Sequence, residues 1–334
     1  MTLPSIEAVA KGPSLPDPLV SVVLLTYNHE PFIEDALLGV LGQVAPFDIE
    51  VIVTEDCSTD ATLEVVERIR QGTTWDFTVL SSPVNLCSNT VVRRALDIAR
   101  GEFVAVLDGD DYWTDEHKLE RQVEFLRRHP DFSMCFHDVL KVDDASGTVV
   151  EETVLGTVEL TRCDLVRGHP LPPACSPLVR REALSGLPES FDDADFGDWP
   201  LHLQAVHEGR VGGIGATMGV YRLHAGGIWT GAPEAARWRT YLAFLDDLDI
   251  ARDDPCWASW QEGRGLALWR IAVALVEQGR GSEARRFARR ALASPGASGY
   301  GRWATSRLLT LAIASRLYRH VLKVRHSRST PWSP

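Results

Sequence analysis

Apolar residues follow two different periods along the first part of the chain. Residues 20–25 form a run of β-branched and aliphatic residues that is interrupted only by Ser21, which is typical of a strand buried on both faces. Similar runs at residues 49–53, 77–80 and 103–107 are predicted to be strands, and apolar residues at helical spacing lie between them. This alternation predicts an α/β protein with a mostly parallel sheet flanked by helices.

The regular alternation ends after Asp111. A helix with Leu119 and Leu126 on its inner face is predicted next, followed by a strand at residues 133–140. The chain then becomes irregular, with hairpin-like segments. Within it, Gly212-Gly213-Ile214-Gly215 is interpreted as a turn, because it follows no strand-to-helix start and so does not fit a dinucleotide-binding loop.

The C-terminal part has a different composition. From about residue 235 it is rich in Ala, Leu, Arg and Trp, with apolar residues at helical spacing as far as Val321. We therefore expect a C-terminal all-helical extension. The predicted division of the chain is a leader at 1–18, an α/β domain at 19–230, a helical domain at 231–328 and a tail at 329–334.

The charge is uneven. The formal net charge of −12 argues against nucleic acid as a partner, because such binding depends on Lys and Arg side chains that displace counterions. From Gly281 onward there are eleven Lys or Arg residues and one Glu, so this segment carries about +10 and the rest about −22. We interpret it as helices with a solvated basic face. The alternatives left open are contact with an anionic membrane surface, with an acidic peptide or with the acidic α/β domain of the same or a neighbouring chain, and homodimerisation through apolar helical faces.

We expect neither a secretory signal in residues 1–12 nor a membrane-spanning helix. Residues 1–12 lack the basic start and apolar run of a secretory signal, and no stretch approaches the roughly 18 apolar residues that a spanning helix needs. The six cysteines form no C-x-x-C pair. We expect a cytoplasmic protein, with peripheral contact at the inner membrane face left open by the basic C-terminal segment.

Three carboxylates follow the fourth predicted strand, in Asp108-Gly109-Asp110-Asp111. Ligands of open α/β sheets gather outside the carboxyl ends of the strands, and closely spaced carboxylates suit hard divalent ions such as Mg²⁺. Acidic loop tips are also common as merely solvated loops. The position directly after an apolar strand favours a metal held on a diphosphate.

The second predicted strand also ends in polar residues, at 54–60. Ser58 or Thr59 is expected to cap the following helix. Capping leaves Glu55 and Asp56 unexplained. A carboxylate at this strand end, beside Thr26-Tyr27-Asn28, suits hydrogen bonds to a base and a ribose.

Taken together, these motifs resemble the family-2 inverting glycosyltransferases with the GT-A fold. The resemblance covers about residues 19–140, where the motifs agree in order and spacing. The matching segments are VSVVLLTYN at 20–28, EDCSTD at 55–60, GEFVAVLDGDDYW at 101–113, KLE at 118–120 and HP at 129–130. A weaker likeness continues through residues 176–181, 197–199 and 221–224, and the helices from about residue 235 lie outside it.

The resemblance implies a role for several residues. Asp56 matches the acid that reads the nucleotide base, and Asp108 matches the acid on the ribose side. Asp110 matches the acid that meets the metal, with His224 closing over the diphosphate or its metal. Asp198 matches the catalytic base. The implied donor-binding set is Thr26, Tyr27, Asn28, Glu30, Asp56, Asn85, Asp108 and Gly109, and His137, Trp199 and His202 are candidate acceptor contacts.

Plainer interpretations stand beside these roles. Asp198 suits a helix N-cap ahead of Pro200, and His224 suits a packing or surface histidine. An aromatic such as Trp199 near a helix start is more often part of the core. The segment after Asn85 lacks the Gly that many members carry, which puts its donor contacts in doubt.

The function implied by the resemblance is transfer of a sugar, with inversion, from a nucleoside diphosphate sugar of UDP or dTDP type, assisted by Mg²⁺ or Mn²⁺. The acceptor would be a hydroxyl or other nucleophile of a cell-surface glycan, a lipid-linked sugar, a peptide or a natural product. Residues 19–112 would bind the nucleotide sugar and residues 113–230 the acceptor. The alternatives are a sugar nucleotidyltransferase, which should carry a Gly-rich basic loop after the first strand, and a non-catalytic nucleotide-binding scaffold with a partner-binding helical tail.

Overall fold

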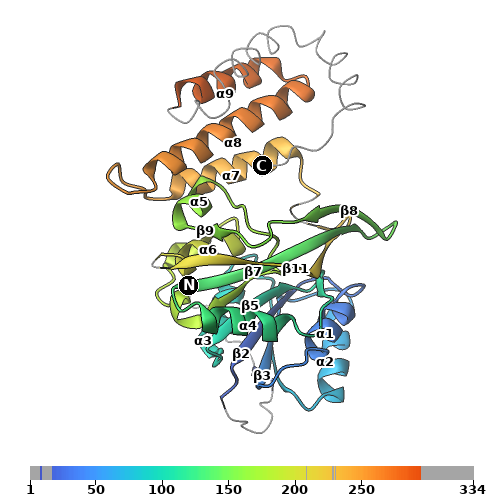
Figure 1. Cartoon of the computed structure of the whole chain (residues 1–334). Helices are drawn as coiled ribbons and strands as arrows, with labels where there is room; N and C mark the ends of the chain where they lie inside the picture. The colour runs from blue at the N-terminus through green and yellow to red at the C-terminus, as the bar shows by residue number, and fades with distance from the viewer. Residues whose placement is uncertain (1–7, 10–16, 208, 228, 230, 295–334) are drawn as a thin grey trace. The chain divides into compact units, whose positions relative to one another are not determined.

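The structure is a computed structural model that describes residues 8–9, 17–207, 209–227, 229 and 231–294 (Figure 1). The chain forms two compact units, one of residues up to Leu165 together with Pro170–Ala225, the other of Val166–His169 together with the chain from Gly226 onward. Most of the predicted leader, the predicted helical positions after residue 294 and the predicted tail lie outside the described residues.

The first unit is built on a sheet whose first half is parallel, as the hydrophobic runs predict. In spatial order its strands are β4 (Asp76–Ser81), β3 (Ile49–Glu55), β2 (Val20–Thr26) and β5 (Phe103–Asp108). β2 pairs with β3 on one side and with β5 on the other, both in parallel. β3, β2 and β5 therefore end side by side at one edge of the sheet.

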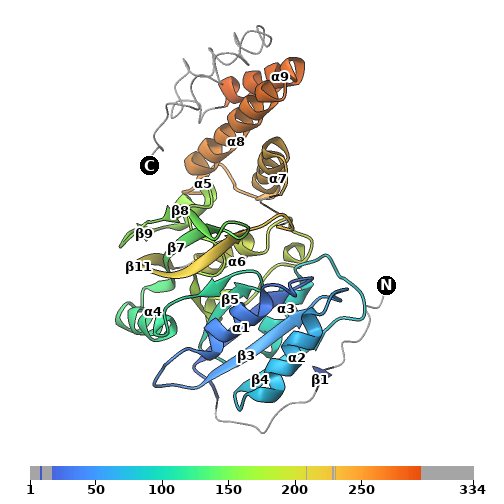
Figure 2. The same cartoon turned by 90° about the vertical axis from the view of Figure 1, so that its right-hand side faces the viewer.

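Helices cover both faces of this sheet (Figure 2). One face carries α1 (Ile33–Leu41), α2 (Thr62–Gly72) and α4 (Lys118–Arg128), whose apolar side chains share a core with Val22 and Leu24 of β2. The opposite face carries α3 (Thr90–Ile98) and α6 (Asp198–Ala205), which share a second core with Val23. Because successive residues of a strand point to opposite faces, the apolar residues 22–25 of β2 serve both cores.

The second half of the sheet is mixed. β10 (Leu178–Arg180) runs antiparallel between β5 and β7 (Phe132–Asp143), and β7 pairs in parallel with β11 (Arg210–Leu223). The remaining strands are β1 (Ala8–Val9) on β4, β6 (Tyr112–Trp113) and β9 (Glu159–Leu160) on β11, and β8 (Thr148–Thr153) on β7. Short helical segments at α5 (Arg162–Arg167), η1 (Arg181–Leu184) and η2 (Glu189–Phe191) complete the described elements of this region.

The interpretation of Gly212-Gly213-Ile214-Gly215 as a turn is wrong, because these residues lie inside β11. A Cβ atom at Gly212 would lie 2.3 Å from the ring of Phe125, and one at Gly213 would lie 2.1 Å from the carbonyl oxygen of Gly156. The glycines therefore let neighbouring groups approach the strand closely, a use of glycine in strands that sequence alone does not separate from a turn.

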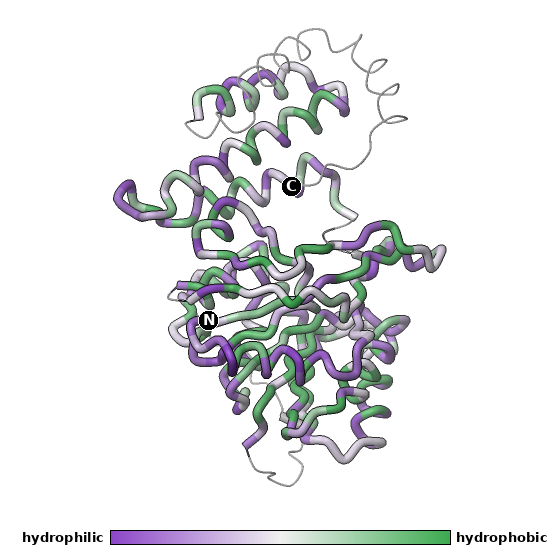
Figure 3. Tube along the Cα trace, in the orientation of Figure 1, coloured by the Kyte–Doolittle hydropathy of each residue, from purple (hydrophilic) through white to green (hydrophobic). Residues whose placement is uncertain are grey.

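The second unit is helical over its described residues, as the composition predicts. It contains α7 (Glu234–Asp247), α8 (Trp257–Glu277) and α9 (Gly281–Ala293). Leu242, Leu268, Ile271, Leu275 and Phe287 belong to its apolar core. The hydropathy pattern shows apolar strands in the sheet and mixed polar and apolar positions along the helices (Figure 3). Among the described residues, no helix is both long and apolar enough to span a membrane.

Candidate active site

The polar strand ends predicted from the sequence meet at one edge of the sheet. Thr26 at the end of β2 lies in register with Glu55 of β3, and the preceding Leu25 lies in register with Asp108 of β5. The backbone N–H of Asp56 donates to the carbonyl oxygen of Thr26 at 3.1 Å. The loops after three strands are therefore joined.

The loop after β5 brings three carboxyl groups together. Asp108, Asp110 and Asp111 each offer an oxygen atom within 4.8 Å of the other two. Asp111 is 1% exposed, and its Oδ2 has no hydrogen-bond partner among the residues that the structure describes. Hard divalent cations prefer closely spaced carboxylate oxygens as ligands, so these residues fit a metal ion.

Burial and mutual repulsion raise the pKa values of two carboxyl groups in this cluster. Burial, then the charges of Asp110 and Asp198, raise the pKa of Asp108 to about 8. Burial and the charges of Asp110 and Asp108 raise the pKa of Asp111 well above its ordinary value. Strongly shifted carboxyl groups are characteristic of functional sites, because a bound cation or substrate relieves the repulsion.

Asp198 faces the same cluster from a different part of the chain. It is the first residue of α6, whose N-cap is Gly197, so Asp198 is not the N-cap. Its Oδ1 accepts the backbone N–H of Trp199 at 2.7 Å. Its charge contributes to the raised pKa of Asp108 and, after burial and the charges of the Asp108 loop, to that of Tyr221. The carboxylate predicted as a base therefore lies near the acidic loop.

Two histidines approach one oxygen of Asp110. His224 Nε2 lies 3.1 Å from Oδ2 of Asp110, and the His224 ring packs on Phe32 with 4.6 Å between ring centroids. His29, in the loop after β2, places its Nε2 3.7 Å from the same oxygen. Burial lowers the pKa of His29, partly opposed by the charge of Asp110.

The loop after β2 is held by its own polar side chains. Asn28 has a left-handed backbone, with φ of 55°. Its N–H donates to Ser58 Oγ at 2.9 Å, and its Oδ1 accepts the N–H of Thr59 at 2.8 Å. Thr26 is 4% exposed and Tyr27 38% exposed, so Tyr27 is the more accessible of these two predicted donor contacts.

The expected capping of α2 by Ser58 or Thr59 is wrong. Asp60 Oδ1 accepts the N–H of Thr62 at 3.0 Å, and Glu30 Oε2 accepts the N–H of Ala61 at 3.1 Å. Asp60 Oδ2 in turn accepts the N–H of Glu30 at 3.1 Å. Glu30, predicted as a donor contact, thus joins the loop after β2 to the start of α2.

Glu55 and Asp56 have different surroundings. Glu55 is 2% exposed, and its carboxylate accepts hydrogen bonds from the N–H of Ser58 and from Ser81 Oγ, so it supports the loop and is closed to a base or ribose. Asp56 is half-buried, and its Oδ1 accepts the N–H of Leu86 at 2.9 Å. Asn85 Oδ1 accepts the N–H of Cys87 at 2.8 Å within a tight turn.

Gly109 fits its site because it has no side chain. A Cβ atom there would lie 2.8 Å from Nδ1 of His29 and 3.0 Å from Thr26 Oγ1 and from Ile33 Cδ1. The acidic loop and the loop after β2 therefore meet at Gly109.

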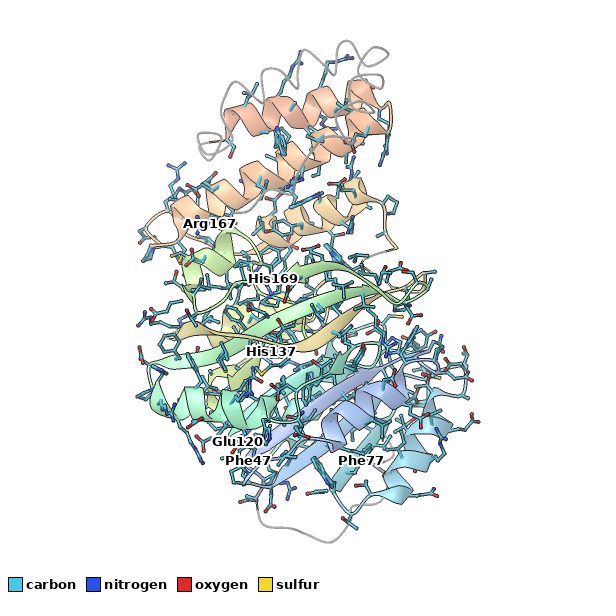
Figure 4. The ribbon with its side chains drawn as sticks, turned by 45° about the vertical axis from the view of Figure 1, so that its right-hand side comes forward. Phe47, Phe77, Glu120, His137, Arg167 and His169 are labelled. Carbon is cyan, nitrogen blue, oxygen red and sulfur yellow. The ribbon has the colours of Figure 1, made fainter. Side chains whose placement is uncertain are left out.

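The three predicted acceptor contacts are buried, which contradicts a direct contact in this structure. His137 and Trp199 are 0% exposed, and His202 is 3% exposed. His137 lies in β7 (Figure 4), where burial and the charge of Lys118 lower its pKa to about 3. Trp199 Nε1 donates to the carbonyl oxygen of Leu165 at 2.8 Å. The core interpretation of Trp199 is the one that the structure supports.

Sequence reasoning missed two residues beside the cluster, namely His29 and Arg222. The backbone N–H of Arg222 donates to Oδ1 of Asp111 at 2.9 Å. The signal available in the sequence was position alone, since His29 follows Asn28 directly and Arg222 precedes His224 by two residues.

The part of the chain that contains most of these residues is similar to known proteins. Residues 21–185 match the family model described as Glycosyl transferase family 2. An uncharacterised protein of Mycobacterium tuberculosis is 33% identical over 227 residues, or 66% of this chain, and the chain spans 64% of the length of that relative. The putative teichuronic acid biosynthesis glycosyltransferase TuaG of Bacillus subtilis is 33% identical over 151 residues, covering 45% of this chain and 58% of TuaG.

Solved structures share the fold. Residues 1–349 of TarS from Staphylococcus aureus, in complex with UDP-GlcNAc, give a TM-score of 0.59 at 19% identity over 94% of this chain and 93% of that chain. The mannosyltransferase PcManGT from Pyrobaculum calidifontis, in complex with GDP-Man and Mn²⁺, gives a TM-score of 0.54 at 20% identity over 93% of this chain and 86% of that chain. These likenesses confirm the predicted GT-A fold with C-terminal helices.

Proposed function

Because residues 21–185 form a glycosyl transferase family 2 domain, we propose that this protein transfers a sugar, with inversion, from a nucleoside diphosphate sugar to an acceptor nucleophile. The observation that carries the proposal is the cluster of Asp108, Asp110 and Asp111 at the carboxyl ends of the parallel strands, with Asp198 of α6 near enough for its charge to raise the pKa of Asp108. Ligands of open α/β sheets bind at this edge.

A donor of UDP type is supported by TarS, whose structures hold UDP and UDP-GlcNAc. We assign Asp56, with Tyr27 beside it in the adjoining loop, to the base, and Asp108 to the ribose. Asp56 is half-buried, and its Oδ1 accepts the N–H of Leu86. The other carboxylate oxygen, Oδ2, is the atom proposed to bind the base. The Mn²⁺ of PcManGT supports a divalent cation at the diphosphate.

Asp110 and His224 would hold that cation, with the rest of the acidic loop contributing negative charge. Mg²⁺ and Mn²⁺ are the proposed ions. Such a cation supplies Lewis-acid stabilisation of the charge that develops on the departing diphosphate, an effect of several kcal/mol.

Asp198 is the proposed general base. Its carboxylate would take the proton of an acceptor hydroxyl while the hydroxyl oxygen bonds to the anomeric carbon and the bond from that carbon to the diphosphate breaks. Attack opposite to the leaving group inverts the anomeric centre, so one added carboxylate suffices. A positioned base contributes about 10²- to 10⁴-fold to such a step.

The acceptor is proposed to be a sugar hydroxyl of a cell-surface or lipid-linked glycan, with peptides and natural products as further candidates. The name of TuaG, which refers to teichuronic acid biosynthesis, supports the first of these. A cytoplasmic location, contact of the basic C-terminal segment with the inner membrane face, and a homodimer belong to the same proposal.

The test uses the purified full chain and a panel of UDP-, dTDP- and GDP-sugars, with Mn²⁺, with Mg²⁺ and with EDTA. We expect one donor to raise the melting temperature in the presence of a divalent cation, because a ligand that binds the native state stabilises it. We also expect slow donor hydrolysis that EDTA abolishes. Full hydrolysis in EDTA would contradict the metal site, and donor binding without hydrolysis or transfer to any acceptor would favour the non-catalytic scaffold.

A further inference from the structure

His29 is the side chain beside the acidic loop to which the preceding assignments give no role. Its backbone N–H donates to Thr62 Oγ1 at 2.8 Å, and its carbonyl oxygen accepts the N–H groups of Phe32 and Ile33 at the start of α1. Its Nδ1 lies where a Cβ atom at Gly109 would meet it at 2.8 Å. These contacts place the imidazole between the two loops, and its Nδ1 is buried with no hydrogen-bond partner among the described residues.

The other ring nitrogen points to the proposed metal ligand. His29 Nε2 lies 3.7 Å from Asp110 Oδ2, and His224 Nε2 lies 3.1 Å from that same oxygen. The side chains of His29, His224 and Asp110 are 19%, 11% and 21% exposed, so all three retain limited access from the site. Two imidazoles from distant parts of the chain thus meet at one carboxylate.

Imidazole nitrogen changes the preference of a metal site. Mg²⁺ is served best by carboxylate, carbonyl and water oxygens, whereas first-row transition ions accept imidazole readily. Resting on the proposed function, we propose that His29 is a further protein ligand, beside Asp110 and His224, of the cation at the donor diphosphate, and that this second imidazole makes the site select Mn²⁺ or Co²⁺ over Mg²⁺.

The surroundings of Asp110 support this assignment, because among the residues that the structure describes these two histidines are the basic side chains within 4 Å of its carboxylate. The backbone hydrogen bond from His29 to Thr62 and the packing of the His224 ring on Phe32 place both rings beside Asp110.

The test is pulsed EPR of Mn²⁺ bound to the full chain in the presence of UDP, which detects directly coordinated nitrogen without any turnover. We expect two coordinated imidazole nitrogens in the wild type and one in each of His29→Ala and His224→Ala. His117→Ala is the matched control, because His117 is 41% exposed and pairs with Glu116 and Glu120 away from the acidic loop. It should retain both nitrogens.

Calorimetry with Mn²⁺ and with Mg²⁺, each with UDP, supplies the second readout. We expect His29→Ala to weaken Mn²⁺ binding at least about tenfold, the lower end of the effects known for residues around metal sites, and to weaken Mg²⁺ binding less. His29→Asn, which keeps a small polar side chain, serves if the alanine variant does not fold.

The outcomes separate this inference from the proposed function. A wild type that binds Mn²⁺ and UDP with a single nitrogen, or a His29→Ala variant with unchanged Mn²⁺ affinity and unchanged EPR spectrum, overturns the role of His29 alone. A wild type that binds neither UDP nor Mn²⁺ overturns the proposed function and this inference with it.

Discussion

The backbone N–H of Arg222 and the carboxylate of Asp111 form a 2.9 Å hydrogen bond that ties the end of β11 to the acidic loop. The Arg222 side chain is 12% exposed and pairs with Asp35 and Asp144. Its guanidinium also lies 5.3 Å from the ring centroid of Phe32, the ring on which His224 packs. Arg222 therefore holds both the strand end and the ring beside the proposed metal ligand.

From this arrangement we predict that Arg222→Met weakens the binding of Mn²⁺ with UDP by about tenfold, as changes around a metal site do. It should also lower the free energy of unfolding by about 1–3 kcal/mol, through loss of charge-assisted hydrogen bonds. Calorimetry and urea unfolding measure the two effects.

Arg210→Met is the matched control for that variant. Arg210 lies at the other end of β11, pairs with Asp131 and Glu159, and covers the ring of Phe132. The control should lose stability without losing ligand affinity. Equal loss of affinity in both variants would show that Arg222 acts through stability alone.

Asp198→Asn tests the proposed base. We predict that kcat falls by about 10²- to 10⁴-fold while the affinity for UDP with Mn²⁺ is nearly unchanged, because only the proton-accepting charge is removed. The exposed Asp195, in the loop that precedes α6, provides the control Asp195→Asn, which should keep full turnover. Unchanged kcat in Asp198→Asn would place the base at another residue.

Gly109→Ala tests the contact between the acidic loop and the loop after β2. The added Cβ atom would lie 2.8 Å from His29 Nδ1, so we predict a loss of about 1–3 kcal/mol in unfolding free energy and weaker donor binding. Gly72→Ala is the control, since a Cβ atom there meets nothing within 4 Å and a helical Gly→Ala change should be neutral or stabilising. If Gly109→Ala is as stable as the wild type, the two loops can move apart with little loss of free energy.

Lys118 provides a pH-dependent prediction. The side chain is 0% exposed, its Nζ lies 3.8 Å from the ring centroid of Trp113, and Nζ has no hydrogen-bond partner among the described residues. Burial lowers its pKa from 10.5 to about 7. Between these values the unfolded chain binds more protons at this lysine than the folded chain does, so this group makes the free energy of unfolding rise with pH.

We therefore predict that Lys118→Met removes this rise and adds about 1–4 kcal/mol of stability at pH 7, as replacement of buried charged groups by apolar ones often does. Urea unfolding between pH 7 and 8.5 measures the slope, and the titration of the cysteines cancels in the comparison because Lys118→Met and the wild type contain the same cysteines. Lys141→Met, at a half-exposed lysine paired with Glu151, should keep the wild-type slope. If the free energy of unfolding rises equally with pH in Lys118→Met and in the wild type, the pKa of Lys118 is not lowered in the folded protein.

The sequence by itself determined the parallel half of the sheet and the polar edge at which its strands end. Runs such as residues 20–25 are apolar on both faces, and that property is local and readable without the fold. The acidic loop after β5 was equally readable, because its residues are adjacent in the chain and follow a strand. The helical character of residues 234–293 also followed from spacing and composition.

Tertiary structure alone decided which polar side chains face the site and which are enclosed. His137, Trp199 and Glu55 occupy plausible positions in the sequence but are buried, because packing from other elements covers them. His29 and Arg222 meet the acidic loop through contacts that span most of the first unit. The spacing of apolar residues along the chain reveals whether a segment is a strand or a helix. Which distant segments come into contact depends on how all the elements of the unit pack together, and this cannot be read from a short stretch of sequence.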